Sequence, residues 1–467
     1  MIARSLYRTL VPDAPPHRRT ETDERGPEAS VRSAAIREVQ PGLQSPRLVS
    51  SYAGSIDRIL FCFPMWASEH PSLVAGYLSV LEALRPGTQF VVAQNTSAQP
   101  TIEEWFTKAG HSLSNVEFTP LPDFIMLTDW AEDAYVSLKD DADGSDYLME
   151  PWEFGRWGDA LIADAVEEYT GIRVSSSPLI FQGGNCLVGD DFWLLGTDYI
   201  ADTVALVTRD RAPAPVPPGD DPRQWAAALF RQYVDARRTL TPIGTRRPIP
   251  LREFRGTREG DTFLLDLAME GVGTFQPIFH IDMFVTLVGR DADGAFQVLV
   301  GSPALADELL GTRSPYALAD VYDGIAEDLR RSGFAVRRNP LVHLPSPGAS
   351  HHLSALREFA KGDDRLVPAI DELVAAGGQE DTPVQARTWH HVTWNNCLVE
   401  NSTSVGRHVY LPTYGHGARA ALGVVDEAMG ALWEELGFTP HLLGDFNDFA
   451  ERQGVVHCIK KYLTRGD

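Results

Sequence analysis

The apolar run Ile-Leu-Phe-Cys-Phe-Pro at residues 59–64 opens the pattern that decides the fold class. A stretch of helical character at residues 71–84 follows, and then a second apolar run, Gln-Phe-Val-Val-Ala, at residues 89–93. Short apolar runs bounded by turn residues are typical of buried strands, so this segment predicts a strand, a helix and a second strand. Strands that alternate with helices indicate an α/β fold, and the recurrence of one unit favours a ring or stack of modules. Comparable units recur around residues 178–195, 278–288, 296–300, 397–412 and 455–463.

The remaining segments predict helices, connections and a tail. The proline-rich residues 212–221 suit neither a helix nor a central strand, and we expect them and residues 340–350 to be connections between modules. Residues 1–50 are rich in Arg, Pro, Ser and Glu without apolar periodicity. We therefore expect a flexible N-terminal tail at residues 1–50 and a single folded domain at residues 51–467. Helical patterns occur at residues 157–169, 222–236, 317–332, 353–361 and 418–436.

The overall charge is strongly acidic. The 467 residues include 64 acidic and 41 basic side chains, for a formal net charge of -23. Such a chain repels nucleic acid phosphates and anionic membranes, so neither is an expected partner, and a cationic partner is the natural complement. The alternative interpretation is that the net acidity only keeps the protein soluble.

Cysteine usage and the N-terminal residues predict the compartment. The four cysteines lie far apart, without the short spacing of a zinc site or the density of a disulfide framework, so reduced thiols are expected. The N-terminus has early arginines but no apolar core of signal-peptide length, and no run of about 18 apolar residues occurs. These features predict a soluble cytoplasmic protein.

The segment at residues 279–288 reads as a buried strand that begins with two polar groups, His280 and Asp282. Side chains alternate between the two faces of a strand, so both groups would point to the same face. An imidazole beside a carboxylate is suited to acid–base chemistry. For an isolated H-x-D sequence, the alternative is a histidine bonded to a neighbouring aspartate for structure alone.

Three further segments carry candidate site residues, and each has a purely structural alternative. The sequence Gln182-Gly183-Gly184-Asn185 allows a close backbone approach, or it is a tight turn. Asp133 ends the sequence Trp-Ala-Glu-Asp and could bind a cation, or it is simply solvated. Cys458 follows His457 within ten residues of the chain end, where a thiol is either a nucleophile or a small buried hydrophobe.

Taken in order, these features resemble one family pattern. The pattern resembles the guanidino-group modifying superfamily, which includes arginine, agmatine and peptidylarginine deiminases, dimethylargininases and amidinotransferases. The resemblance spans residue 59 to the C-terminus and implies an α/β-propeller of five pseudo-symmetric, pentein-like modules around a central site. The matching segments are Trp130 to Asp133, Gly183 to Asn185, His280 to Asp282, Tyr410 to Gly415, and His457 with Cys458.

The resemblance also implies roles for individual residues. Cys458 would be the nucleophile, His280 the general acid/base, and Asp133 and Asp282 the two carboxylates that hold a planar, permanently charged guanidinium. Gln182 and Asn185 would belong to the substrate-binding loop. Gln182 departs from the glutamate usual in arginine and agmatine deiminases, because a neutral amide cannot stabilise an imidazolium by charge. The sequence Arg452-Gln453-Gly454 also departs from the consecutive glycines of many relatives.

The resulting hypothesis is a cysteine-dependent hydrolase acting on the C–N bond of a linear amidine. Arginine, agmatine or a peptidyl arginine would yield a citrulline-type ureido product and ammonia through a covalent thiouronium, without a metal or an organic cofactor. One alternative is an amidinotransferase that passes the amidino group to an acceptor amine. Another is a catalytically degenerate propeller that only binds an arginine-bearing peptide. A metal hydrolase is disfavoured, because the tandem pairs His351-His352 and His390-His391 would point to opposite faces of a strand.

Overall fold

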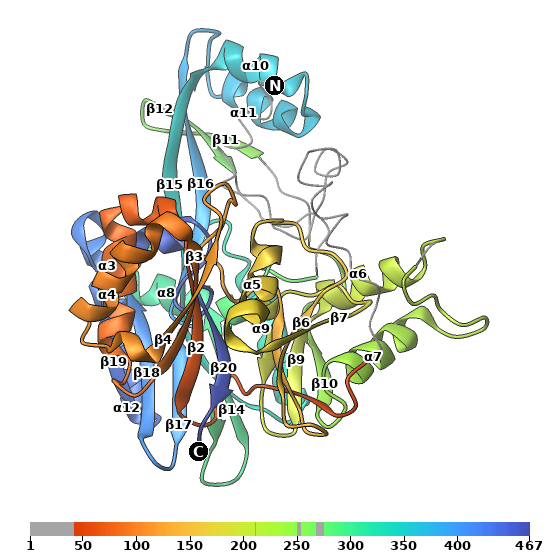
Figure 1. Cartoon of the computed structure of the whole chain (residues 1–467). Helices are drawn as coiled ribbons and strands as arrows, with labels where there is room; N and C mark the ends of the chain where they lie inside the picture. Colours follow the sequence, from red (N-terminus) through yellow and green to blue (C-terminus); the bar gives the residue numbers. More distant parts are fainter. Residues whose placement is uncertain (1–41, 211, 250–253, 268–274) are drawn as a thin grey trace.

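The computed structural model describes residues 42–210, 212–249, 254–267 and 275–467 (Figure 1). In this part of the chain, helices and short strands alternate, and the strands form five sheets. The expected α/β fold is therefore confirmed. Most of the predicted tail at residues 1–50 lies outside the described residues, but residues 42–50 are described and include β1 (Pro46–Leu48), so regular structure begins before residue 51. Among the described helices, none is long and apolar enough to span a bilayer.

The first sheet joins the beginning of the folded chain to its end. Its strands, in spatial order, are β20 (Lys460–Arg465), β2 (Ile56–Phe63), β3 (Gln89–Asn95) and β4 (Val116–Leu121). Its helices are η1 (Met65–Glu69), α3 (Pro71–Ala83), η2 (Thr96–Ala98), α4 (Gln99–Lys108) and η3 (Leu113–Asn115). Strand β20 runs antiparallel to β2 and pairs Lys460 with Phe61. The C-terminal strand thus belongs to the same sheet as the first apolar run of the sequence.

Two smaller sheets follow. The second sheet contains β1, β5 (Val136–Asp140), β6 (Asp146–Glu150) and β7 (Arg173–Ser176), with η4 (Asp159–Leu161) and α5 (Ile162–Thr170) before β7. The third contains β8 (Cys186–Val188), β9 (Phe192–Gly196) and β10 (Thr239–Ile243), with η5 (Gly183–Asn185), α6 (Thr197–Val207) and α7 (Pro222–Tyr233).

The largest sheet has the spatial order β11, β12, β16, β15, β14, β13. These strands are Phe254–Glu259, Thr262–Leu267, Pro383–Thr393, Ala335–His352, Phe296–Ser302 and Val285–Arg290. Its helices are η6 (Ile281–Met283), α8 (Pro303–Leu310), α9 (Ala319–Arg331), α10 (Leu353–Ala360), η7 (Asp364–Leu366) and α11 (Val367–Ala375). The last sheet contains β17 (Leu398–Ser402), β18 (Gly406–Thr413) and β19 (Thr439–Asp445), with η8 (Gly417–Leu422), α12 (Gly423–Glu435) and α13 (Asn447–Glu451).

One strand pattern recurs in the described sheets. An antiparallel pair is followed by a helix and by a strand parallel to the second member, as in β5, β6 and β7. The same order holds for β8 to β10, β13 to β15, and β17 to β19. In the first sheet, β20 and β2 form the antiparallel pair and β3 follows α3. A recurring α/β unit, expected from the sequence, is therefore present, with a helix in the crossover to each parallel strand. Its first two strands are antiparallel, so the ranges 178–195 and 397–412 hold antiparallel pairs rather than a strand, a helix and a strand.

Strands β15 and β16 extend past the other sheets as an arm (Figure 1). The far end of this arm carries β11, β12, α10 and α11, whose apolar residues form a hydrophobic cluster of their own around Leu265, Leu356 and Ile370. Strand β16 runs from that end toward Asn395 and Asn396. The arm therefore delivers these two polar residues to the body of the protein.

Three sequence-based expectations are wrong in detail. Residues 340–350, expected to be a connection, lie inside β15. His280 and Asp282 do not share a strand, because η6 covers Ile281–Met283 and β13 begins only at Val285. Cys458 lies in a turn, and β20 begins at Lys460 rather than at residue 455. Residues 212–221 contain no helix or strand, as expected.

Candidate active site

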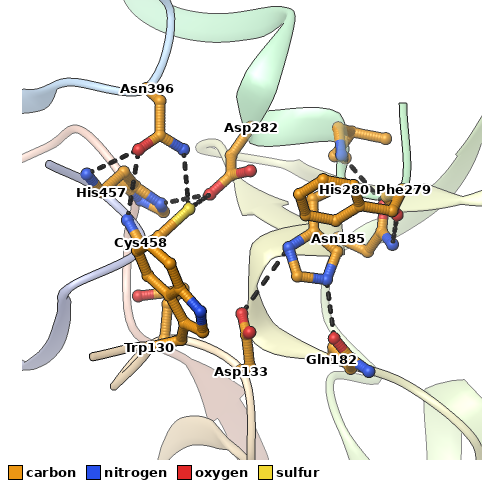
Figure 2. A network of polar contacts seen from close by, with 12 residues as sticks. Trp130, Asp133, Gln182, Asn185, Phe279, His280, Asp282, Asn396, His457 and Cys458 are labelled. Carbon is orange, nitrogen blue, oxygen red and sulfur yellow. Dashed lines mark hydrogen bonds and ion pairs between the residues drawn. The ribbon is translucent and has the colours of Figure 1, made fainter. Parts of the chain in front are cut away.

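Cys458 lies in the turn that leads into β20, close to the centre of the polar network in Figure 2. Its side chain is buried, with 2% of its surface exposed, and it is unpaired, like the other three cysteines. Gly454 precedes this turn against Trp130, and a Cβ on Gly454 would come within 2.2 Å of the indole ring. A glycine is thus required for the nucleophile loop to pack on Trp130.

Asn396 fixes this loop from the end of β16. Its Oδ1 accepts hydrogen bonds from the backbone N of His457 at 2.9 Å and of Cys458 at 3.2 Å. Its Nδ2 donates to Cys458 Sγ at 3.2 Å. One buried amide therefore orients both the backbone and the sulfur of Cys458.

Asp282 lies directly beside the thiol. Its Oδ2 is 4.0 Å from Cys458 Sγ and 2.8 Å from His457 Nδ1. Its Oδ1 is buried without a hydrogen-bond partner among the described residues. The carboxylate is thus held through one oxygen and leaves the other available.

His280 bridges Gln182 and Asp133 on the other side of the site (Figure 2). Its Nε2 lies 2.7 Å from Gln182 Oε1, and its Nδ1 lies 3.6 Å from Asp133 Oδ1. Since an amide oxygen only accepts hydrogen bonds, Nε2 carries the hydrogen in this arrangement, and Nδ1 is the bare nitrogen of the neutral ring.

The paired glycines allow His280 to occupy this position. A Cβ on Gly184 would lie 2.5 Å from His280 Nδ1, and one on Gly183 would lie 1.9 Å from the backbone O of Glu132. Asn185 places the histidine segment, because its Nδ2 donates to Phe279 O at 2.7 Å and its Oδ1 accepts from Ile281 N at 3.0 Å. The close approach expected of the Gly-Gly sequence is thus to the site itself, and the polar atoms of Asn185 are engaged by the backbone.

Asp133 lies in a turn ahead of β5 and is buried, in contrast to the solvated alternative. Its Oδ2 accepts a hydrogen bond from Arg156 Nη2 at 2.6 Å. Its Oδ1, which faces His280, has no hydrogen-bond partner in the described part of the chain. Asp133 and Asp282 therefore each present one unpartnered oxygen.

Burial dominates the electrostatics of the site. Together with the negative charges of Asp282 and Asp133, it raises the pKa of Cys458 well above the usual thiol range. Burial, reinforced by the charge of Arg156, lowers the pKa of His280 to about 3. Burial also raises the pKa of Asp282 well above its usual range, with a contribution from Glu132. The site thus favours a neutral thiol and a neutral imidazole at neutral pH.

A buried ionic cluster lies behind the nucleophile turn. Lys460 Nζ and Lys461 Nζ each lie 2.8 Å from one oxygen of Glu132. Burial alone would raise the pKa of Glu132, but the two ammonium groups outweigh it and lower the pKa to about 2. Burial lowers the pKa of Lys460 to about 8. Because Glu132 N also donates to Cys458 O at 3.1 Å, the cluster ties the Trp130–Asp133 turn to the nucleophile turn.

All six site residues expected from the sequence lie in this region. Their positions come from the structure, whereas the roles assigned to them come from the chemistry of their side chains. The sequence did not identify Asn396 or Arg156 as site residues, and it did not show that His457 contacts Asp282. The only sequence signal for Asn396 was the polar pair Asn395-Asn396 inside an apolar stretch. In the described residues, no group of three or more His, Cys, Asp or Glu side chains is arranged to hold a metal ion.

Comparison with solved structures relates this arrangement to known proteins. A candidate agmatine deiminase matches with a TM-score of 0.55 and 13% identity, over 91% of this chain and 97% of the other. The agmatine deiminase of Enterococcus faecalis matches with a TM-score of 0.51 and 12% identity, over 91% and 98%. These neighbours belong to the guanidino-group modifying superfamily, and the chain shares their fold. A candidate peptidyl-arginine deiminase has the same fold, with a TM-score of 0.51 and 12% identity over 91% of this chain and 100% of the other.

The resemblance drawn from the motifs to the guanidino-group modifying superfamily is therefore confirmed for the fold. No protein-family model matches the sequence. A search of curated proteins also found no match. At this level of identity, a shared fold does not define the function, which depends on the residues of the site.

Proposed function

We propose that the chain is a cysteine-dependent deiminase, which hydrolyses the guanidinium group of an arginine-type substrate to a ureido product and ammonia. The observation that carries the proposal is the set of buried atoms without hydrogen-bond partners in the described residues, namely Asp133 Oδ1, Asp282 Oδ1 and His280 Nδ1. Two carboxylate oxygens and a ring nitrogen are acceptors suited to the N–H groups of a guanidinium. Gly184 lies between the two halves of the site, since a Cβ there would be 2.5 Å from His280 Nδ1 and 3.2 Å from Asp282 Oδ2. Asp282 Oδ2 in turn lies 4.0 Å from the buried Sγ of Cys458.

The charge of the substrate supports this chemistry. Burial and the negative charges of Asp282 and Asp133 raise the pKa of Cys458, so a cation bound between the two carboxylates offsets part of the effect that keeps the thiol protonated. The thiol proton passes to a base, and the proposed acceptor is His280 Nδ1, the ring nitrogen that carries no hydrogen. The substrate thus helps to generate the thiolate that attacks it.

The reaction then follows in two stages. Attack of the thiolate on the guanidinium carbon gives a tetrahedral adduct, and the proton returned by His280 leaves with ammonia. A covalent thiouronium remains, and water activated by the neutral imidazole attacks it. Collapse of the second adduct breaks the C–S bond, so the net change is guanidinium plus water to a ureido product plus ammonium.

We further propose that the five sheets are the modules of a closed propeller within one catalytic domain, which includes β1 and so begins before residue 51. The pairing of β20 with β2 supports this arrangement, because it joins the last strand of the chain to the first unit. In such a ring, the turn that carries Cys458 would face the centre.

The test is incubation with arginine, agmatine and a blocked arginine peptide, followed by detection of ureido product and ammonia. Cys458→Ala should lose more than about a thousandfold in kcat while keeping the thermal unfolding midpoint close to that of the wild type. No product from any of the three compounds, or full activity of the alanine variant, would refute the proposal. Ornithine and a new guanidine in the presence of an acceptor amine would identify an amidinotransferase instead.

Gln182 favours a second candidate function, a propeller that binds an arginine-bearing peptide without turnover. The amide accepts from His280 but carries no charge, and the pKa of His280 is low. Binding of the arginine peptide that persists in Cys458→Ala, with no ammonia from the wild type over a long incubation, would support this alternative.

A further inference from the structure

Arg156 makes an ion-pair bridge between two buried carboxylates. Its Nη2 lies 2.6 Å from Asp133 Oδ2, and its Nε lies 2.6 Å from Asp159 Oδ2. Asp159 in turn accepts from Thr128 N at 2.8 Å and from Thr128 Oγ1 at 2.6 Å. The guanidinium of Arg156 is therefore held through two of its nitrogens, and it connects the turn that carries Asp133 to η4.

Asp133 and Asp282 are each held by the protein through one carboxylate oxygen. Arg156 holds Oδ2 of Asp133, and His457 holds Oδ2 of Asp282. In both carboxylates, Oδ1 is buried and has no hydrogen-bond partner in the described part of the protein. In each carboxylate, the protein engages one oxygen and leaves the other to accept a hydrogen bond from the substrate.

The surroundings of Arg156 place it at the edge of the site. Its side chain is 22% exposed, whereas that of Asp133 is 5% exposed. The guanidinium also lies over the ring of Phe154, 5.0 Å from the ring centroid. A planar group with several fixed donors satisfies this geometry with two separate nitrogens, whereas a lysine has all its donors on a single nitrogen at the end of a flexible stem.

We propose that Arg156 is a positioning residue for the deiminase reaction, which holds Asp133 ionised and turns Asp133 Oδ1 toward the substrate. The inference rests on the proposed function. It assigns the substrate guanidinium one hydrogen bond to Asp133 and one to Asp282, rather than a bidentate pair with either carboxylate. Arg156 does not itself contact the reacting atoms.

Other charged and titratable groups also act on Asp133. Burial raises the pKa of Asp133, and Arg156 is the main opposing influence. Tyr135 and Tyr199, whose pKa values burial raises well above the usual phenol range, stay neutral. The remaining groups near Asp133 are Glu132, Lys461, His280, Asp282, Cys458 and, through Arg156, Asp159.

The sign of the expected pH effect follows from this balance. Arg156 lowers the pKa of Asp133, so Arg156→Met should raise it and move the acid limb of kcat/KM to higher pH, by about one unit or more. KM should rise by about tenfold or more, with a smaller change in kcat. Arg156→Lys keeps the charge but loses the bridge. It should therefore raise KM while leaving the acid limb near that of the wild type.

The experiment measures pH profiles of the full-length wild type, Arg156→Met and Arg156→Lys with arginine, agmatine and a blocked arginine peptide. Arg173→Met is the matched control, because Arg173 pairs with Asp143 on the surface and has 56% of its side chain exposed. An Arg156→Met profile that matches the control in both KM and acid limb would overturn the proposal. If the Met variant does not fold, the KM of the Lys variant decides the question in the same way.

A separate measurement distinguishes this inference from the proposed function. Calorimetric titration of the same three compounds into Cys458→Ala, with and without Arg156→Met, reports binding without turnover. Weaker binding on loss of Arg156, most marked at low pH, supports the role of Arg156 even when the wild type releases no ammonia. Equal binding in the two backgrounds contradicts it, whatever the activity of the wild type.

Discussion

The two sides of the site are built by different kinds of interaction. The nucleophile side comprises Cys458, His457, Asn396 and Asp282. There, a neutral amide fixes the thiol and two backbone N–H groups through three hydrogen bonds. Such contacts set positions, and they depend little on pH, because an amide does not titrate.

The base side comprises His280, Gln182, Asp133 and Arg156, and it is governed by charge. A buried cation holds one carboxylate, and the neutral ring of His280 lies between that carboxylate and an amide. Because burial penalises every charged form here, each removed or added charge changes the protonation of its neighbours. Variants on the nucleophile side should therefore change kcat, whereas variants on the base side should change the pH dependence of the reaction.

Apart from loss of the nucleophile itself, the largest effect should come from Asn396→Ala on the nucleophile side. Loss of the three hydrogen bonds frees the turn of Cys458, and a misplaced nucleophile costs about a hundredfold in kcat. The limbs of the kcat/KM profile should stay at the wild-type pH values. A stopped-flow or steady-state pH series measures both quantities, with Asn115→Ala as the control, because Asn115 is a half-buried amide in η3 whose Nδ2 donates to Pro86 O at 3.0 Å. A shift of either limb of the kcat/KM profile to another pH would show that the nucleophile side also controls the pH dependence.

Gln182→Glu should have the next largest effect, on the base side. A carboxylate that accepts from Nε2 stabilises the imidazolium, so the pKa of His280 should rise from about 3 by more than one unit. Titration of the His280 ring by NMR measures the shift directly. Gln182→Ala removes the acceptor without adding charge and should leave the pKa low. An unchanged pKa in the Glu variant would mean that burial alone determines the state of His280.

The smallest effect should be on stability, through His280→Gln. The pKa of His280 is about 3 in the folded protein and about 6.5 when unfolded, so its contribution to stability is complete above pH 6.5 and is lost as pH falls toward 3. Between pH 7 and pH 5.5, the free energy of unfolding should therefore fall by about 1 kcal/mol more in the wild type than in His280→Gln. Urea unfolding at the two pH values measures the difference. Asn396→Ala should show the wild-type pH dependence, and equal slopes in His280→Gln and wild type would contradict the assignment.

Much of the fold follows from local patterns. The strands β2 and β3 were predicted because alternate side chains are buried on both faces, with Phe61 and Val92 in one cluster and Leu60 and Val91 in another. Residues 340–350 were misread because Pro345 and Pro347 suggest a connection. In that part of β15, only β16 is a neighbour, so a proline removes no hydrogen bond on its open side.

The candidate site was predictable only in part. The H-x-D sequence was expected to be a strand, but Asn185 satisfies Phe279 O and Ile281 N through its side chain, so the backbone turns there without ladder partners. Asn396 and Arg156 could not be identified, since their contacts join residues 62 and 23 positions apart in the chain. No local pattern encodes which distant partner a polar side chain will meet.

The sequence by itself determined the α/β class, the recurring units and the chemical types present near the site, because apolar periodicity and glycine placement act over a few residues. Tertiary structure alone decided how those types are coupled. The pairing of β20 with β2, the glycine at residue 184 beside His280, and the single anchored oxygen on each carboxylate all depend on packing between distant segments. Burial produced by that packing, rather than residue type, makes Cys458 a neutral thiol and His280 a neutral base.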